Sequence, residues 1–498
     1  MSTLRADVQR DSGILRRLYR RHLAKYRWGR WLKNAYAASR ATAIEFRNRA
    51  AWIVLPWTSR LRLLAYTRLQ ITARALLEIS GRGGLTSLAR ATCQTLSTLA
   101  ESSSRLLVHN ASFFRLVSYS EFLARGGRVH HLYSEEAVSL TLPTVYPERL
   151  RDHLHQGSWP LRIPALYAFE VPDAVVMGRS DLVYSGGDCL HHGLYNFSRD
   201  HLMEEMHGFV SVNARRKAIV RFAGKRVSAS IPEAISLVGS VTSNYVHWLT
   251  ETAPKLALLV NRDILERAPL ILDSGLHPNI LESVRLLNLG GRPIIELGPS
   301  ERLQVGKLVS VSPVAYVPFE FKKGIQMRML DIDPSFALYS PVALQSLREQ
   351  LVRRVTGQSP DKICGTRRLY LRRSARSRQM ANATEVEALV ANLGFEIVEP
   401  DGLSFRAQVE LFSDAAVVLG QGGAAFGNVV FAPPGCHVVV LSTWSPYTIY
   451  YYFSNISSVL HQRCSLLLCE PVLDTEGPHR AHFGLHVPIE TLRQVLLS

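Results

Sequence analysis

Two groups of residues that can bind anions follow separate apolar runs in the carboxyl-terminal part of the sequence. The run Leu369–Leu371 is followed by Arg372, Arg373, Arg376 and Arg378, and the run Ala415–Leu419 is followed by Gly420-Gln421-Gly422-Gly423. Guanidinium groups make bidentate contacts to phosphate oxygens. Glycines let the backbone approach a phosphate before a helix whose free N–H groups favour negative charge. A solvated basic loop and a tight turn would explain each group alone, but their shared position in one unit favours a diphosphate ligand.

The residues around these groups predict an α/β fold. Strands are expected at 369–371, 395–398, 415–419 and 437–441. Helices lie between them, one capped by Asn382 and the next by Ser404. Short links between alternating strands and helices imply a parallel, doubly wound sheet, whose ligands bind beyond the carboxyl ends of the strands. Both anion-binding groups fall at such ends.

A similar α/β unit precedes this one. Strands are expected at 174–177, 181–184, 234–241, 269–272 and 293–297, with helices at 245–260 and 277–287. A helix and polar loop at 340–360 would link the two units and mark a domain boundary.

The helix expected at 245–260 carries an imidazole and a carboxylate one turn apart. His247 and Glu251 are separated by four positions, so they share one helix face. Such a carboxylate holds the tautomer of the imidazole and raises its basicity, which suits a general base acting on a hydroxyl group. The alternative is a hydrogen-bonded pair on a helix surface, with Trp248 in the core. A zinc site would need further ligands, and the HExxH pattern is absent.

Other groups of potential metal ligands are incomplete. Cys464 and Cys469 have no second pair, and His191-His192 follow the turn Gly186-Gly187-Asp188. Three further histidines near the carboxyl end lie among turn residues: His479, His482 and His486. Loops and buried apolar cysteines explain these residues better than a metal does, so no metal is expected.

The composition indicates a folded protein of two or three domains. The 498 residues are 47% hydrophobic and 20% charged, and the formal net charge is +17. Residues 1–130 hold 23 lysines and arginines against 6 acidic residues, while the rest of the chain holds 35 of each, so the excess charge lies in the first segment. The six scattered cysteines, the lack of a membrane-spanning apolar run and the lack of a signal-peptide pattern favour the cytoplasm.

Basic and aromatic residues share the first helical segment. Tyr19, Tyr26 and Trp31 are interleaved with arginines and lysines between Arg16 and Lys33. Such a helix can lie on an anionic membrane, with its rings at the headgroup level, or bind a polyanion or a partner subunit. A cationic helix packed on its own protein is the alternative. Nucleic acid is the least favoured partner of residues 1–74.

The motifs and their order resemble glycosyltransferase family 61. Residues 244–251, Asn-Tyr-Val-His-Trp-Leu-Thr-Glu, with Pro254, are similar to its N-Y-x-H-W-x-x-E-x-x-P motif. The later motifs of the family are matched by the arginine tract from Tyr370 to Asn382, by Gly394-Phe395-Glu396-Ile397-Val398, by Gln408 and by the stretch from Asn428 to Gly435. The similarity covers about residues 165–445. Bacterial members of the family are often associated with capsular or other surface polysaccharide synthesis.

The resemblance implies two Rossmann-like domains of the GT-B type. These domains would follow a basic, mainly helical extension at 1–130, with the acceptor-side domain at 131–340 and the donor domain at 341–470. Residues 471–498 would form a tail whose apolar helix packs back on the first Rossmann-like unit. The implied activity is inverting transfer of a sugar from a nucleotide-diphosphate sugar, with no metal or other cofactor.

The resemblance also implies roles for single residues. His247, oriented by Glu251, would deprotonate the acceptor hydroxyl, with Asn244 and Trp248 on the acceptor side. The donor would be bound by Arg372 or Arg373, whose register is ambiguous by one position, and by Arg378, Asn382, Gln421, Gly422, Gly423, Ala424 and Asn428. The expected acceptor is a hydroxyl of a glycan or lipid-linked molecule in surface polysaccharide synthesis, at the inner face of the plasma membrane.

Two departures from the family pattern leave a second function open. The chain reads Gly422-Gly423-Ala424-Ala425-Phe426 where the family reads H-G-A-G-L or H-G-A-A-L, so an imidazole is missing and Gln421 is the replacement donor. Val440 stands in place of the usual acidic residue of the next strand. The alternative function is therefore a catalytically degenerate scaffold, recruited to an anionic membrane or polyanion by its basic helices.

Overall fold

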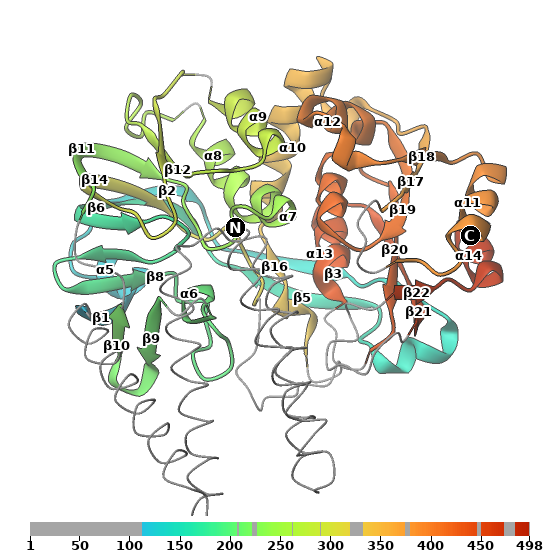
Figure 1. Cartoon of the computed structure of the whole chain (residues 1–498), viewed down its shortest axis with the longest axis horizontal. Coiled ribbons are helices and arrows are strands. Elements are labelled where there is room, and N and C mark those ends of the chain that lie inside the picture. The colour runs from blue at the N-terminus through green and yellow to red at the C-terminus, as the bar shows by residue number, and fades with distance from the viewer. Residues whose placement is uncertain are drawn as a thin grey trace, which may run out of the picture. The chain divides into compact units, whose positions relative to one another are not determined.

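The computed structural model describes residues 112–206, 209–221, 227–260, 262–288, 290–318, 332–373, 379–445, 450–472 and 484–497. All of these residues belong to one of the two units into which the chain divides, Leu69–Ser498. The helix predicted for the basic segment, and with it the predicted membrane contact of residues 1–74, lies outside the described residues. The described residues form a mixed α/β structure with several sheets (Figure 1).

An eleven-stranded mixed sheet holds most of the first half of the described chain. Its strands are β1 (Ser112–Ser118), β2 (Val129–Tyr133), β6 (Leu166–Met177), β7 (Val183–Ser185), β8 (Asp188–His191), β9 (Val210–Asn213), β10 (Ala218–Arg221), β11 (Ala229–Ser236), β12 (Leu270–Asp273), β13 (Ile294–Leu297) and β14 (Arg302–Val311). Their order is β13-β12-β11-β14-β6-β7-β8-β1-β10-β9, and β2 pairs with β6. The neighbouring strands β13, β12, β11 and β14 are parallel, as the α/β pattern predicts, whereas β14 and β6 pair antiparallel.

Residues 112–130, which the sequence pattern assigns to the basic extension, contribute to this sheet instead. They supply β1, α5 (Tyr119–Leu123) and the first residues of β2. Leu116 and Val117 explain the difference, because the sheet buries both apolar side chains. The first folded part therefore includes residues 112–130, which the sequence pattern assigned to the extension.

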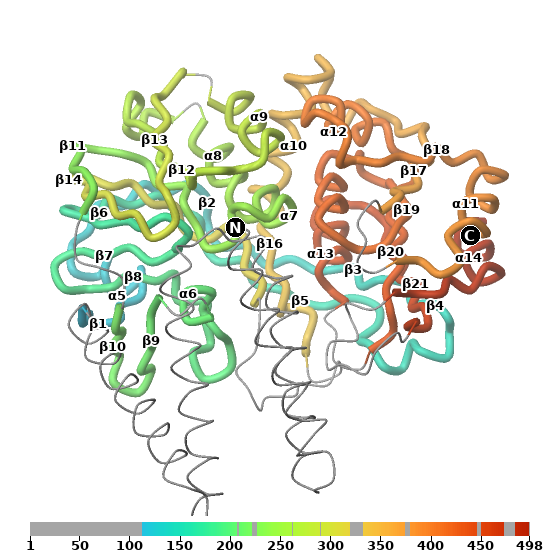
Figure 2. Tube along the Cα trace, viewed as in Figure 1, coloured from blue at the N-terminus to red at the C-terminus, as the bar shows by residue number. Residues whose placement is uncertain are grey.

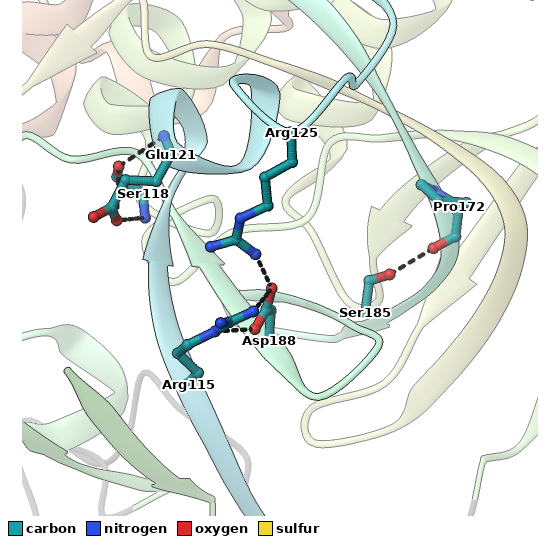
Figure 3. A network of polar contacts seen from close by, with 7 residues as sticks. All are labelled: Arg115, Ser118, Glu121, Arg125, Pro172, Ser185 and Asp188. Atoms are coloured by element: carbon teal, nitrogen blue, oxygen red, sulfur yellow. Dashed lines mark hydrogen bonds and ion pairs between the residues drawn. The ribbon is translucent and has the colours of Figure 1, made fainter. Parts of the chain in front are cut away.

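Asp188, the first residue of β8, forms an ion pair with Arg115 of β1 (Figure 3). Asp188 accepts hydrogen bonds from Arg115 Nε at 2.8 Å and Nη2 at 3.0 Å, and from Arg125 Nη1 at 2.6 Å. These two guanidinium groups, Arg115 first, hold the pKa of Asp188 below its usual range. In the same network, Ser118 and Glu121 form a capping box at the start of α5.

Five helical elements accompany the first sheet, and three of them begin at a side-chain cap. They are α7 (Tyr245–His247), the π-helical turn η4 (Trp248–Thr252), α8 (Ala253–Leu259), α9 (Pro278–Leu287) and α10 (Pro341–Thr356). Asn244 caps α7, His277 caps α9 and Ser340 caps α10. Pro254 has no N–H to donate to the carbonyl four residues earlier, which accounts for the π-helical turn just before it.

A seven-stranded sheet holds most of the second half. Its strands are β4 (Thr144–Tyr146), β17 (Arg367–Leu371), β18 (Glu396–Val398), β19 (Ala415–Gln421), β20 (His437–Thr443), β21 (Arg463–Val472) and β22 (Gly484–His486). The order β18-β17-β19-β20-β21 is parallel throughout, as predicted from the alternating runs. The strand β4, from the region predicted as the acceptor-side domain, pairs parallel with β21 and buries Val145 completely.

Five helical elements accompany the second sheet: α11 (Ala383–Asn392), α12 (Phe405–Ser413), the 3₁₀ helix η9 (Ala424–Phe431), α13 (Tyr451–Val459) and α14 (Ile489–Leu497). Ser404 caps α12 as predicted. The tail helix α14 differs from its prediction, because it packs on α11 of this half rather than on the first unit. Its apolar side chains Leu492 and Val495 share a core cluster with Val386 and Val390, so the buried face of α14 packs within this half.

Shorter elements connect the larger ones: the paired strands β3 (Glu136–Thr141) and β5 (Ser158–Ile163), the paired strands β15 (Ala315–Tyr316) and β16 (Leu338–Tyr339), the helix α6 (Met203–Met206), and the 3₁₀ turns η2 (Glu148–His153), η3 (Ala214–Arg216), η6 (Pro334–Phe336), η7 (Pro360–Lys362) and η8 (Pro400–Gly402). The tube in Figure 2 allows the path through them to be followed.

The helix α10 joins the two halves. It packs against α8 and α9 of the first half and against α12 and η9 of the second. Its buried residues Leu344, Leu347 and Leu351 belong to one apolar cluster with Leu256 of α8 and Phe412 of α12. The predicted linking helix is therefore present and is part of the core. Within the described part of the chain, no helix combines the length and the apolar character needed to cross a bilayer.

Candidate functional site

The histidine and glutamate predicted to act together are in contact. His247 ends α7 and Glu251 lies one turn later in η4, with His247 Nδ1 2.5 Å from Glu251 Oε1. Only 8% of the His247 surface is exposed, so the pair is sheltered from solvent. With Nδ1–H donating to the carboxylate, Nε2 is the ring nitrogen that can accept a proton. The pair thus has the arrangement of an oriented general base.

A turn between β11 and α7 positions this pair. The strand β11 ends at Ser236, earlier than the predicted end at Val241, because two aspartates hold the next residues in a turn. Asp273 accepts hydrogen bonds from the Gly239 amide at 3.0 Å and from the Thr242 hydroxyl. Asp181 accepts from the Ser240 amide at 3.2 Å and from its hydroxyl. These bonds replace strand pairing and lead the chain into the cap at Asn244.

His247 and Glu251 line a pocket of about 90 Å³. Other residues that line the pocket include Asp181, His192, Tyr195, Lys255 and Tyr316. The pocket lies beyond the carboxyl ends of β11 and β14, where open α/β sheets bind their ligands. Burial lowers the pKa of Lys255, while Asp181 and Glu251 act in the opposite direction. The imidazole pair therefore faces a polar, partly desolvated space.

A buried carboxylic acid lies behind one wall of the pocket. Glu204 accepts hydrogen bonds from the Ser180 hydroxyl and the Asp181 amide, both at 2.8 Å. Its second oxygen, Oε2, has no hydrogen-bond partner among the described residues. Burial, with the neighbouring Asp181 carboxylate, raises the pKa of Glu204 to about 7. The acid therefore gains or loses its proton near neutral pH.

The two residues predicted on the acceptor side have structural contacts. Trp248 is completely buried, and its Nε1 donates to Ser283 Oγ at 2.8 Å. The Asn244 side chain accepts from the Val246 amide at 3.3 Å and so caps α7. Both residues hold the helix that carries His247, and neither lines the described pocket.

The two adjacent arginines at the end of β17 have different surroundings. Arg372 donates to both oxygens of Glu387 at 2.8 and 2.6 Å and to Glu399 at 3.2 Å, so its guanidinium group is held by two carboxylates. The Arg373 Nη1 atom lies 2.9 Å from the position that a Cβ of Gly423 would take. Burial lowers the pKa of Arg373, while Asp401 raises it. The structure thus brings Arg373, rather than Arg372, to the glycine-rich loop.

The glycine-rich loop follows β19 as predicted. Gln421 is the last residue of β19, and Gly422 packs closely on Phe453 and Val440. Gly423 is extended and precedes Ala424, the first residue of η9. The amides of this loop therefore open a helix next to the Arg373 guanidinium group, and the start of a helix favours negative charge.

Two predicted donor residues are placed elsewhere or lie outside the described residues. Arg378, and with it Arg376, falls in the stretch that the structure does not describe. The Asn382 side chain donates to the Val487 carbonyl at 2.8 Å and accepts from the Val487 amide at 2.9 Å. It therefore ties α11 to the segment before α14, and it makes no side-chain cap to α11.

Asn428 connects the loop to the helix that carries His247. Its amide nitrogen donates to Gln408 Oε1 at 2.6 Å, and its Oδ1 accepts from the Tyr245 hydroxyl at 2.8 Å. One residue earlier, the absence of a side chain at Gly427 lets η9 approach Val246, whose Cα lies 3.0 Å from where a Cβ would be. The start of α7 and the helix after the glycine loop are thus packed together.

Two aromatic residues of α13 connect the imidazole to the glycine loop by successive contacts. The His247 ring lies 5.8 Å from the Tyr452 ring, and the Tyr452 ring lies 4.9 Å from the Phe453 ring, measured between centroids. Phe453 in turn contacts Gly422. The described pocket includes His247 and Glu251 but neither Arg373 nor Gly423. The two predicted groups are therefore linked by packing, without a common described pocket.

Residues 245–439 match the model of the family Glycosyltransferase 61. The match begins with the α7 segment, continues past the glycine loop into β20 and covers less than half of the chain. No curated protein matches the chain. The match supports membership of glycosyltransferase family 61 and, with it, glycosyltransferase activity in general.

The glycosyltransferase 61 region alone does not supply the whole pocket. Asp181, His192 and Tyr195 lie before residue 245. The sequence pattern places Asp181 in a strand, offers His192 only as a potential metal ligand and gives no signal for Tyr195. His192 and the neighbouring His191 are accounted for by the fold, since each Nδ1 accepts a hydrogen bond from a nearby backbone amide. Lys255, which follows Pro254 at helical spacing from Glu251, is the lining residue that helix periodicity would have indicated.

Among the described residues, no group of three His, Cys, Asp or Glu side chains is placed to hold a metal ion. Cys464 and Cys469 are free cysteines, and burial raises the pKa of both thiols to about 12. His486 lies in β22, while His479 and His482 fall outside the described residues.

Proposed function

We propose that the protein transfers a sugar from a nucleotide-diphosphate sugar to a hydroxyl group of a glycan or lipid-linked acceptor, with inversion at the anomeric carbon. The observation that carries the proposal is the His247–Glu251 contact inside a pocket at the strand ends. The family match of residues 245–439 supports a glycosyltransferase, and the two parallel strand units support a GT-B arrangement of two Rossmann-like domains.

In the proposed reaction, the acceptor hydroxyl gives its proton to His247 Nε2 while its oxygen attacks the anomeric carbon of the donor. The bond between that carbon and the diphosphate oxygen breaks, and the diphosphate leaves with the bonding electron pair. Because one displacement occurs at one carbon, the configuration inverts. Glu251 stabilises the imidazolium that forms, so the base is regenerated when the proton passes to solvent.

The departing diphosphate would be bound at the start of η9. The Arg373 guanidinium group and the amides of Gly423 and Ala424 supply positive charge and N–H donors to the same space. We propose that these groups neutralise the leaving group without a metal. Arg372 would contribute indirectly, because its ion pairs with Glu387 and Glu399 hold the end of β17.

Binding and turnover test the proposal separately. Calorimetry with UDP, GDP and CDP should show binding of at least one diphosphate, and the corresponding nucleotide sugar should be hydrolysed slowly or transferred. His247→Ala should keep the diphosphate affinity and lose turnover. If none of the diphosphates binds to the full chain, or if His247→Ala keeps normal turnover, the proposed mechanism is excluded.

A degenerate scaffold is the second candidate function. Gly422 occupies the position of the usual donor-loop imidazole, and Val440 Cγ1 lies 3.4 Å from the Gly422 Cβ position in place of an acidic group. If the diphosphate binds but no nucleotide sugar is turned over by the wild-type chain, the scaffold is favoured. The surface-polysaccharide role, and a location at the inner face of the plasma membrane through residues 1–74, rest on the sequence pattern. Sedimentation of the full chain with anionic vesicles, compared with a chain lacking residues 1–74, tests that location.

A further inference from the structure

One wall of the pocket beside His247 is aromatic. The ring centroids of His192 and Tyr195 are 4.0 Å apart, those of His192 and Tyr316 are 5.3 Å apart, and those of Tyr195 and Tyr316 are 5.4 Å apart. All three residues line the pocket. Tyr316 is held in place because its hydroxyl donates to the buried Asp200 at 2.8 Å. The rings therefore form a fixed apolar surface, here called the aromatic wall (His192, Tyr195, Tyr316).

The other lining residues supply hydrogen-bonding groups of both kinds. Asp181 keeps its carboxylate oriented through the bonds from Ser240. Lys255 also lines the pocket, and no carboxylate of the described residues lies within ion-pair distance of its ammonium group. A carboxylate accepts from hydroxyl groups and an ammonium donates to them, so a ligand with neighbouring hydroxyls can satisfy both.

We propose that this pocket binds the accepting sugar of the acceptor as a single uncharged sugar ring. One face of the ring packs its C–H bonds on the aromatic wall, its hydroxyls bind Asp181 and Lys255, and one further hydroxyl is presented to His247. The inference rests on the proposed glycosyltransferase function and names the substrate class for its acceptor side. An apolar wall with a few convergent polar groups is the usual composition of a small-ligand site.

The charges of the pocket favour a neutral sugar over an acidic one. Two carboxylates, Asp181 and Glu251, line it together with one ammonium, Lys255. A uronic acid would add a third negative charge close to the first two, and like charges in a partly desolvated space repel. The volume of about 90 Å³ holds several water molecules, which the hydroxyls of one sugar residue would replace.

Saturation-transfer NMR on the full chain tests the inference with defined probes. The probes are the methyl glycosides of glucose, galactose, mannose, xylose and N-acetylglucosamine, together with methyl glucuronide. At least one neutral glycoside should bind, and its affinity should exceed that of the glucuronide by about tenfold, as expected for one unfavourable charge contact. No binding by any neutral glycoside, or equal binding of the glucuronide, would overturn the proposal.

Matched variants locate the binding in this pocket. Tyr195→Leu removes one ring of the aromatic wall and should weaken the best neutral glycoside about fivefold. Phe197→Leu is the control, because Phe197 belongs to the same loop but does not line the pocket. If Tyr195→Leu does not fold, Asp181→Asn keeps the shape of the side chain and should weaken binding about tenfold. Unchanged affinity in the folded variant would place the glycoside elsewhere and reject the proposal.

A parallel measurement separates this inference from the proposed function. Nucleotide-diphosphate affinity depends on the loop around Arg373 and should be the same in Tyr195→Leu, in Phe197→Leu and in the wild type. Diphosphate binding without any glycoside binding contradicts the pocket assignment only. Glycoside binding that Tyr195→Leu weakens, in a chain that binds no diphosphate, supports the pocket and contradicts the transferase.

Discussion

The imidazole of His247 and the guanidinium group of Arg373 reach their positions by different routes. His247 and Glu251 are neighbours on one helical segment, and their contact needs only the local geometry of that segment. Arg373 lies at the end of a strand, where adjacent side chains point to opposite sides. Its neighbour Arg372 turns to Glu387 and Glu399, and Arg373 turns to Gly423. Helical spacing therefore determines directly which two side chains meet. The positions of adjacent side chains at a strand end depend instead on the residues that pack around them in the tertiary structure.

Removal of the imidazole should have the largest effect on activity. His247→Ala should lower the rate of sugar transfer or donor hydrolysis by about 10²–10⁴-fold, because general-base catalysis contributes a factor of this size. Steady-state kinetics with the matching nucleotide sugar measures it. Glu251→Gln should cause a smaller loss, since the imidazole remains but loses its charged partner. His131→Ala, an exposed histidine outside the pocket, is the control. A rate for His247→Ala close to that of the control would contradict the role of the pair.

The adjacent arginines provide the second test of the comparison. Arg373→Ala should reduce turnover by about 10²-fold and weaken diphosphate binding, as expected when one donor to a developing negative charge is lost. Arg372→Ala should change diphosphate affinity much less, because it breaks mainly partly exposed ion pairs of small energetic value. Calorimetry with the diphosphate and kinetics with its sugar measure both variants. Equal losses in the two variants would show that Arg372 also contacts the donor.

The pocket beside His247 and the loop around Arg373 should also differ in their response to pH. Arg373 stays charged, whereas burial raises the pKa of Glu204, behind the pocket, to about 7. From about pH 4.5 to 7 the unfolded chain releases this proton while the native protein keeps it, so the contribution of Glu204 to stability falls as pH rises and is constant above pH 7. In Glu204→Gln this fall should be absent.

Urea unfolding of both proteins at several pH values measures this difference. Between pH 4.5 and 7.5 the free energy of unfolding of the wild type should fall by on the order of 2 kcal/mol more than that of Glu204→Gln. Parallel pH profiles for the two proteins would show that Glu204 in the native protein does not keep its proton between pH 4.5 and 7.

Loss of the hydrogen bond that joins α7 to η9 should have the smallest effect of the changes considered. Tyr245→Phe removes the hydroxyl that donates to the buried Asn428 and should lower the free energy of unfolding by about 1–2 kcal/mol. Tyr370→Phe is the matched control, because among the described residues its hydroxyl has only a long contact to the Met380 sulfur at 3.8 Å. Urea unfolding compares the two variants. A larger loss in Tyr370→Phe would mean that the bond between α7 and η9 adds little to stability.

Local patterns predicted much of the fold, and the reason is visible in single elements. The helix α12 begins after its Ser404 cap, and the buried runs 415–419 and 437–441 lie in the parallel strands β19 and β20. These features depend on caps and on continuous apolar runs, which are local properties. The early end of β11 was not predicted, because Asp273 and Asp181 hold the turn at 239–242 from other strands and loops.

The functional site follows the same division. The contact of His247 with Glu251 was predictable, because four positions along a helix bring two side chains together. Trp248 was predicted both as an acceptor-side residue and as a core residue, and its complete burial follows from the apolar cluster around it. The preference for Arg373 at the loop needed the position of Gly423, which lies fifty residues away in the sequence.

The sequence by itself determined the helical His247–Glu251 pair, the parallel strands of the second half and the glycine turn after β19, because each depends on residues within one turn or one strand. Only the tertiary structure decided which arginine meets that turn, that Asn428 joins η9 to α7, and that Asp181 and Tyr195 line one pocket with His247. Those contacts join segments separated by tens to hundreds of residues. Packing and hydrogen bonding across the whole fold select them, and no local spacing encodes them.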